Sequence, residues 1–120
     1  MARFRFPQPQ CSPYSKRLFI LTADYHFWDK GKKYTIKKGF KWNGMSVPKA
    51  AWSLVGTPFG PMHCAAGLIH DWLYAKGLLS RLAADRLMKI VLEEHGEKEK
   101  IIEAMYKSVR IFGKKHYKGA

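Results

Sequence analysis

The sequence predicts an α+β protein in which a small N-terminal antiparallel sheet is followed by a three-helix C-terminal part. Two patterns support this prediction. Strand-forming residues alternate with lysines before residue 43, whereas apolar residues recur at helical spacing from about residue 61 onward. The chain has 120 residues, which is the length of one domain. Within that single domain (1–120) we expect an N-terminal arm (1–14), a β hairpin and loop (15–48) and helices (61–113).

The hairpin is predicted from two strand-like segments that flank a turn signal. Segment 17–28 is rich in aromatic and β-branched residues and is interrupted at Ala23-Asp24, and in segment 33–42 apolar residues alternate with lysines. The intervening sequence DKGK, at 29–32, is typical of a tight turn. The alternation predicts one buried face.

Three helices are predicted from apolar periodicity and from capping residues. Ser80 is a favourable N-cap for the second helix, and Gly77 and Gly113 favour the ends of the first and third. The expected bounds are about 61–75, 81–94 and 98–112. Because the connections are short, we expect antiparallel neighbours.

The chain is strongly basic, with 22 Lys and Arg against 9 Asp and Glu and a formal net charge of +13. The lysines are densest in segment 30–41, where they alternate with aromatic residues. Lysines beside aromatic rings suit nucleic acid or another polyanion. They equally suit a hairpin whose solvent face protects the sheet edge from pairing. Both interpretations stay open.

The sequence carries few features that indicate a cellular compartment. The chain has two cysteines, Cys11 and Cys64, so no disulfide framework is required and a reducing compartment is permitted. The N-terminus lacks an apolar run typical of a signal peptide, and we expect no membrane-spanning helix.

One face of the first predicted helix differs from an ordinary solvent-facing stripe. His63, Gly67, His70 and Tyr74 follow each other at spacings of four, three and four, with Asp71 on the flank. Lys, Glu, Gln and Arg, which usually cover an exposed face, are absent from it. We therefore expect this face to lie beneath another element, with polar groups aimed at a cleft. The alternative is that His70 and Tyr74 hydrogen-bond to loop backbone.

The residue types on this face suit acid–base catalysis. His70 titrates near neutral pH and is a candidate general base, with Tyr74 as a supporting hydrogen-bond donor. Asp85 on the second helix lies at a comparable distance from the turn between the two helices, so it is a candidate for orienting His70. Alternatively, Asp85 forms an exposed ion pair with Arg81 or Lys89.

A metal site is a further hypothesis. Asp71 and His63 are ligand types for zinc, calcium or magnesium, but the spacing of His63 and His70 matches no sharp zinc signature. A divalent metal is therefore an open cofactor prediction.

Several short motifs occur in a defined order along the chain. They are Gly39-Phe40, the segment NGMSVP at 43–48, IHDWLY at 69–74, ADRL at 84–87, and Met105-Tyr106 with Val109-Arg110. Together they resemble the domain-of-unknown-function family 1353, over roughly residues 15–117. That family usually has Asp where this chain has Asn43. The resemblance implies bacteriophage or prophage ancestry and a His-Asp-x-x-Tyr helix facing an Asp-bearing helix, and it implies no established activity.

A looser similarity of arrangement connects this helix pair with phospholipases A2. That similarity implies a base role for His70, an orienting role for Asp85 and a calcium-binding role for Asp71, with Tyr74 in support. The cysteine lattice and the calcium loop of those enzymes are absent from this sequence.

Three functional hypotheses follow. The first is a small hydrolase in which Asn43, Ser46, Lys38 and Lys41 contact an anionic substrate such as phospholipid, nucleic acid or cell-wall polymer. The second is a non-catalytic phage protein, either a virion or tail component that contacts other virion proteins or a host-directed inhibitor. The third is a non-specific nucleic-acid binder. The expected location is the host cytoplasm or the virion.

Overall fold

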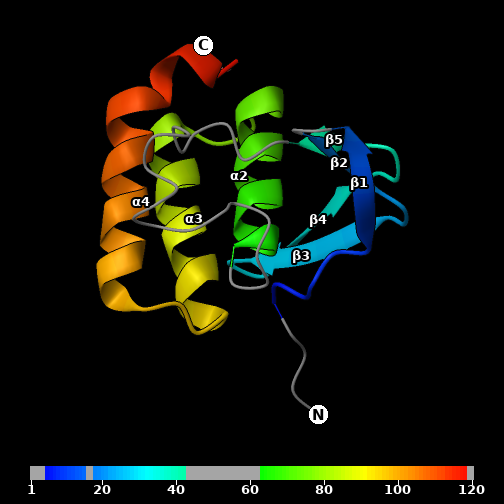
Figure 1. Cartoon of the computed structure of the whole chain (residues 1–120), viewed down its shortest axis with the longest axis horizontal. Coiled ribbons are helices and arrows are strands. Elements are labelled where there is room, and N and C mark those ends of the chain that lie inside the picture. The colour runs from blue at the N-terminus through cyan, green and yellow to red at the C-terminus, as the bar shows by residue number, and fades with distance from the viewer. Residues whose placement is uncertain (1–4, 16–17, 43–62, 119–120) are drawn as a thin grey trace.

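The computed structural model describes residues 5–15, 18–42 and 63–118. It confirms the α+β prediction, since N-terminal antiparallel strands are followed by three helices (Figure 1). Asn43 and Ser46 and the expected helix start at residue 61 lie outside the described residues.

Strands precede helices along the described part of the chain. In order, the elements are β1 (Cys11–Ser15), β2 (Leu18–Leu21), β3 (Tyr25–Asp29), β4 (Lys32–Ile36), β5 (Lys41–Trp42), α2 (Cys64–Lys76), α3 (Arg81–Glu94), α4 (Glu99–Phe112) and the short 3-10 helix η2 (Lys114–His116). None of the helices in the described part of the chain is long and apolar enough to cross a membrane.

The strands form two sheets rather than one long hairpin. β1, β2 and β5 make a three-stranded antiparallel sheet in that order, and among the described strands β3 pairs with β4 alone. The segment 17–28 therefore contains two strands, because the chain turns at Ala23-Asp24, where the Asp24 carboxylate accepts a hydrogen bond from the Lys38 backbone N–H at 2.8 Å. Most of β1 lies in the segment 1–14 that we expected to be an arm.

The hairpin predicted around residues 29–32 is present as β3 and β4. Lys30 and Gly31 both have positive φ angles, of 51° and 77°, as a type I′ turn requires. Phe27 faces Tyr34 across the pair, and their rings stack at 4.9 Å between centroids. Phe27 and Ile36 are fully buried, so the predicted buried face is confirmed.

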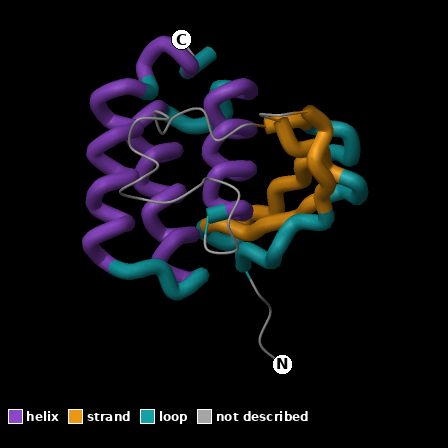
Figure 2. Tube along the Cα trace, in the orientation of Figure 1, coloured by secondary structure: helices purple, strands orange, loops and turns teal. Residues whose placement is uncertain are grey.

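The three helices match the sequence prediction closely. The Ser80 hydroxyl accepts a hydrogen bond from the backbone N–H of Ala83 at 3.1 Å, which caps α3. Gly77 ends α2 in the left-handed conformation, with a φ of 63°. α3 packs against both α2 and α4, and the three helices lie side by side (Figure 2).

Helix α2 occupies the centre of the molecule. It lies between α3 on one side and the strands on the other (Figure 1). Trp72 meets the rings of Phe27 and Tyr34 edge-on, at centroid distances of 6.0 and 6.3 Å. Nearly every side chain of α2 is buried, the polar ones included. The helix therefore has no solvent-facing stripe, which explains the absence of Lys and Glu from most of its length.

The chain after α4 packs closely against the end of α2. A methyl group at Gly113 would lie 2.8 Å from the Tyr74 hydroxyl oxygen and 2.5 Å from the Val109 carbonyl oxygen. We predict that Gly113→Ala lowers the free energy of unfolding by about 1–3 kcal/mol, because backbone must shift to make room. Urea denaturation should show this loss, whereas Lys114→Ala at the exposed neighbouring position should change stability by less than about 0.5 kcal/mol. Equal midpoints for the two variants would contradict the prediction.

Candidate functional site: a buried carboxylate shared by three helices

The centre of the candidate site is the carboxylate of Asp85 on α3. His70 on α2 contacts its Oδ1 through Nε2 at 2.7 Å, and the Tyr74 hydroxyl donates to the same oxygen at 2.5 Å. Arg110 on α4 donates to Oδ2 at 2.6 Å. Three helices thus meet at one fully buried carboxylate. The predicted contact between His70 and Asp85 is confirmed.

The alternative environment for Asp85 is wrong. An exposed ion pair with Arg81 or Lys89 requires a solvent-facing carboxylate, and Asp85 has no exposed surface. Arg81 instead donates to two backbone carbonyl oxygens near the end of α4, at 2.7 and 2.6 Å. Lys89 pairs with Glu103 at 2.7 Å.

The hydrogen bonds on Asp85 set its charge state. Burial alone would raise the pKa of Asp85, but the hydrogen bonds from His70, Tyr74 and Arg110 outweigh it and hold the pKa below its ordinary value. The group is therefore an ionised carboxylate at neutral pH. Burial raises the pKa of Tyr74, and the neighbouring carboxylate raises it further, so the phenol keeps its proton and donates.

His70 is held as a neutral imidazole at neutral pH. Burial lowers its pKa, and the attraction of Asp85 for a positive imidazolium compensates only in part. Because an ionised carboxylate can only accept, Nε2 carries the proton of the His70 ring. Nδ1 is then the basic nitrogen. This is the tautomer that a general base oriented by a carboxylate requires.

A hollow of about 310 Å³ lies beside α2, where Asp71 and Ala75 of that helix line it. Its lining includes Asp71, Trp42 and four basic side chains, and the full set is Leu18, Phe40, Lys41, Trp42, Asp71, Ala75, Lys115, His116 and Lys118. His70 does not line it. Of the polar side chains that the sequence singles out on α2, only Asp71 lines this hollow.

His116 is a site residue that sequence reasoning missed. It belongs to η2, beyond the three predicted helices, and lines the hollow beside Asp71. Burial lowers the pKa of His116, and the positive charges of Lys115 and Lys118 lower it further. The basic tail sequence alone carried no signal for this position.

His63 and Asp71 do not form a metal site together. His63 stands at the N-terminal end of α2 and pairs with Glu97 in the connection between α3 and α4. Eight residues along a helix correspond to about 12 Å, too far for two ligands of one ion. Across the described ranges, no three His, Cys, Asp or Glu side chains gather as a metal site would require.

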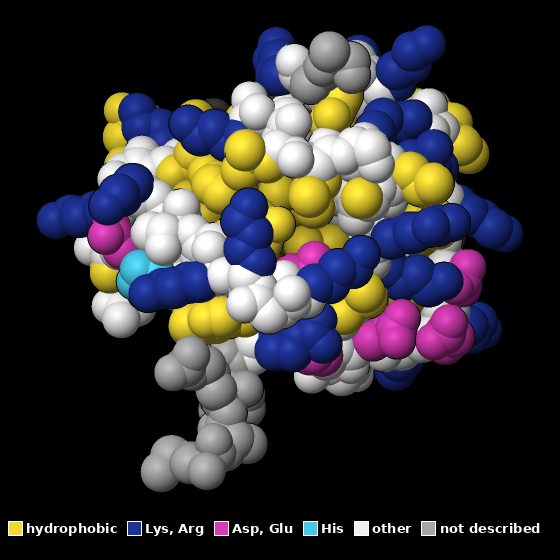
Figure 3. Space-filling view, turned by 180° about the vertical axis from the view of Figure 1, so that it is seen from behind, with side chains coloured by type: hydrophobic (Ala, Val, Ile, Leu, Met, Phe, Trp, Pro, Cys, Tyr) yellow, Lys and Arg dark blue, Asp and Glu magenta, His cyan; other side chains and the backbone are white. Residues whose placement is uncertain are grey.

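The lysines of the strands lie against aromatic rings. Lys41 sits over the ring of Tyr14 at 4.1 Å, and Lys33 over that of Trp28 at 5.9 Å. Lys38 is exposed, and of the two predicted substrate-contacting lysines only Lys41 reaches the hollow. Figure 3 shows one face of the molecule on which Lys and Arg side chains surround and cross a patch of hydrophobic ones.

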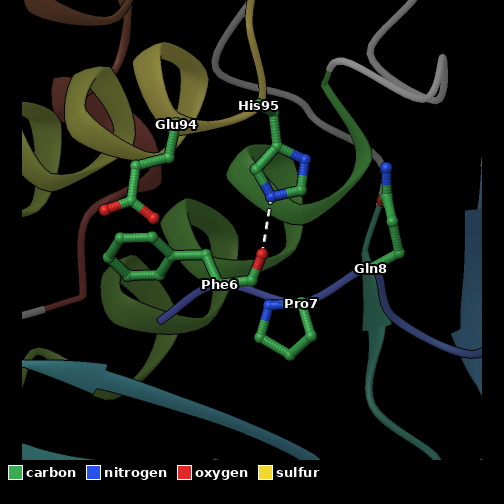
Figure 4. Close-up of a pocket in the computed structure, with 5 residues that line it drawn as sticks. All are labelled: Phe6, Pro7, Gln8, Glu94 and His95. Atoms are coloured by element: carbon green, nitrogen blue, oxygen red, sulfur yellow. Dashed lines mark hydrogen bonds between the residues drawn. The ribbon is translucent and has the colours of Figure 1, made fainter. Parts of the chain in front are cut away.

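A second hollow, of about 280 Å³, lies near the N-terminus, away from the Asp85 network. Phe6, Pro7, Gln8, Glu94 and His95 line it (Figure 4). A ring nitrogen of His95 bonds to the Phe6 carbonyl oxygen at 2.6 Å, which ties the end of α3 to the N-terminal segment. The hydrogen bond gives this histidine a structural role.

These features define a class of protein: an α+β fold in which a buried His–Asp–Tyr–Arg network joins three helices. The family model described as "Protein of unknown function (DUF1353)" matches residues 19–109, and the chain belongs to that family. The chain is also similar to "Uncharacterized protein y4jT" of Sinorhizobium fredii (strain NBRC 101917 / NGR234), with 38% identity over 56 residues. That match covers 46% of this chain and 17% of the relative. No solved structure matches.

We predict a graded loss of stability when the network is dismantled. Asp85→Asn removes the negative charge that pairs with Arg110 and that strengthens the hydrogen bonds from His70 and Tyr74, and it should cost about 3–5 kcal/mol of unfolding free energy. Tyr74→Phe removes one hydrogen bond to a charged group and should cost about 1.5–3 kcal/mol. Urea denaturation of both variants and of the unchanged protein measures which substitution lowers the unfolding free energy more. A Tyr74→Phe variant less stable than Asp85→Asn would contradict the central role of the carboxylate.

The lowered pKa of His70 predicts a pH dependence of stability. Below pH 6.5 the unfolded chain takes up a proton on this histidine that the folded protein resists, so stability falls as pH drops from 6.5 toward the lowered pKa. The lowered pKa of His116 likewise makes stability fall as the pH drops below 6.5. Urea midpoints at several pH values should therefore decrease below pH 6.5. His70→Gln should flatten this slope, and an unchanged slope would contradict the assignment.

Proposed function

We propose that this protein is a small hydrolase in which His70 acts as the general base. The proposal rests on the contact of 2.7 Å between His70 and the buried Asp85. The pair supplies a neutral imidazole, a fixed tautomer and a carboxylate that stabilises the imidazolium formed when a proton is taken up.

The chemistry assigned to these residues is activation of water. Nδ1 of His70 would accept a proton from a water molecule as its oxygen attacks an electrophilic ester carbon or phosphorus. Asp85 would hold the ring and balance the new positive charge, and Tyr74 and Arg110 would keep Asp85 ionised. His70 would return the proton to the leaving group.

We further propose that the substrate is anionic, such as a phospholipid, a nucleic acid or a cell-wall polymer. The hollow beside α2 carries the side chains of Lys41, Lys115 and Lys118, and His116 lines it as well. Positive groups around a concave surface favour phosphate or carboxylate ligands. Asn43 and Ser46, proposed as substrate contacts, lie outside the described residues.

A divalent cation fits poorly at Asp71 among the described residues. Calcium and magnesium require several oxygen ligands, and the other ionisable side chains that line this hollow are three lysines and a histidine, all of them nitrogen groups. The assigned chemistry accordingly uses the side chains of His70 and Asp85 themselves.

One observation favours a second candidate function, a non-catalytic phage protein that serves as a virion or tail component or as a host-directed inhibitor. His70 is only 1% exposed, and both Asp85 oxygens already accept hydrogen bonds. In this proposal the network serves to fix three helices that present a surface to a protein partner. Stoichiometric copies of the chain in purified virions would support the virion version.

Activity assays on His70→Gln distinguish the two candidates. Glutamine can keep the hydrogen bond to Asp85 but cannot act as a base, so we predict a fall in turnover of about 10²–10⁴-fold with the fold intact. The substrates are chromogenic carboxylic esters, bis(p-nitrophenyl) phosphate and vesicles of anionic phospholipid. His26→Gln on β3, which removes a histidine outside the network, is the matched control.

The pH profile provides a second readout. Turnover should rise with pH through the lowered pKa of His70, below 6.5, and then level off. Equal turnover by His70→Gln and the unchanged protein would remove His70 from catalysis. No turnover of any substrate by the unchanged protein would favour the non-catalytic candidate.

A further inference from the structure

The two cysteines of the chain lie side by side although 53 positions separate them in sequence. The Sγ atoms of Cys11 and Cys64 are 3.9 Å apart, and both thiols are free. Cys11 begins β1, the strand at the edge of the three-stranded sheet, and Cys64 is the first residue of α2. A disulfide requires a sulfur separation of about 2 Å, so a further approach of about 2 Å would allow the bond.

We propose that Cys11 and Cys64 form a reversible disulfide by exchange with a low-molecular-weight disulfide such as oxidised glutathione, and that the bond fixes the edge of the sheet to the start of the central helix. The inference is independent of the proposed hydrolase activity, because neither sulfur belongs to the Asp85 network.

The exchange proceeds in two balanced steps. The Cys11 thiolate attacks one sulfur of oxidised glutathione, which forms a mixed disulfide and releases one glutathione thiolate. The Cys64 thiol loses its proton to solvent, and its thiolate attacks the Cys11 sulfur, which forms the protein disulfide and releases the second glutathione. Two protein thiols are oxidised and one glutathione disulfide is reduced.

The different solvent exposure of the two cysteines makes Cys11 the first to react and Cys64 the second. Cys11 is partly exposed and can meet the reagent, whereas Cys64 is buried. Burial raises the pKa of the Cys64 thiol to about 12, and the neighbouring Cys11 adds to the effect. Cys64 is thus a poor first nucleophile, but it stands beside the sulfur that the mixed disulfide activates.

Mass spectrometry of the full chain after incubation with oxidised glutathione tests the proposal. The expected product has a mass lower by two hydrogen atoms, does not react with iodoacetamide, and returns to the starting mass with dithiothreitol. The bond closes a long loop in the unfolded chain, so the melting temperature of the oxidised protein should rise by about 10 °C. Peptide mapping should place the bond between Cys11 and Cys64.

Two single variants make the test specific. Cys64→Ser should stop at the mixed disulfide, with one glutathione attached to Cys11. Cys11→Ser should react much more slowly, because its remaining thiol is buried. A stable glutathione adduct on the unchanged protein without ring closure would overturn the proposal, as would equal reactivity of the two variants. Intermolecular disulfides alone, seen as dimers on a non-reducing gel, would overturn it as well.

Discussion

The rest of the helical structure depends on one buried negative charge. A carboxylate removed from water loses several kcal/mol of solvation, which only charged or hydrogen-bonding partners restore. Asp85 obtains those partners from two other helices: His70 and Tyr74 on α2, and Arg110 on α4. The relative position of three helices is therefore set by the need to satisfy a single group, in addition to apolar packing.

Much of this arrangement was predictable from local sequence, and the rest depends on distant contacts. Ser80 and Gly77 fix the limits of a helical hairpin, and such a hairpin brings His70 opposite Asp85. Arg110 could not be predicted as a partner of Asp85, because it lies 25 residues away and nothing periodic connects the two positions. The contact between His63 and Glu97 could not be predicted either, because 34 residues separate the two positions. Whether His70 acts in catalysis stays a prediction, although its contact with Asp85 is confirmed.

The strands show where the pattern of strand-forming residues in the sequence gives wrong strand bounds. Segment 17–28 reads as one strand because its strand-forming residues continue past the interruption at Ala23-Asp24. In the structure that interruption separates β2 from β3 and sends them into different sheets. β1 was missed because its five residues include a proline and two serines, which are poor strand formers. It forms by pairing with β2, a tertiary contact that outweighs propensity.

Both ends of α2 are attached to segments that come later in the chain. His63 is bonded to Glu97 at one end, and the Tyr74 carbonyl oxygen accepts the backbone N–H of Lys118 at 2.9 Å at the other. Helix ends ordinarily fray, which lets their amide protons exchange with solvent by local opening. Fraying at either end of α2 would also break a tertiary contact. Its amides should therefore exchange mainly when the whole helical part unfolds, which makes α2 the slowest-exchanging element of the protein.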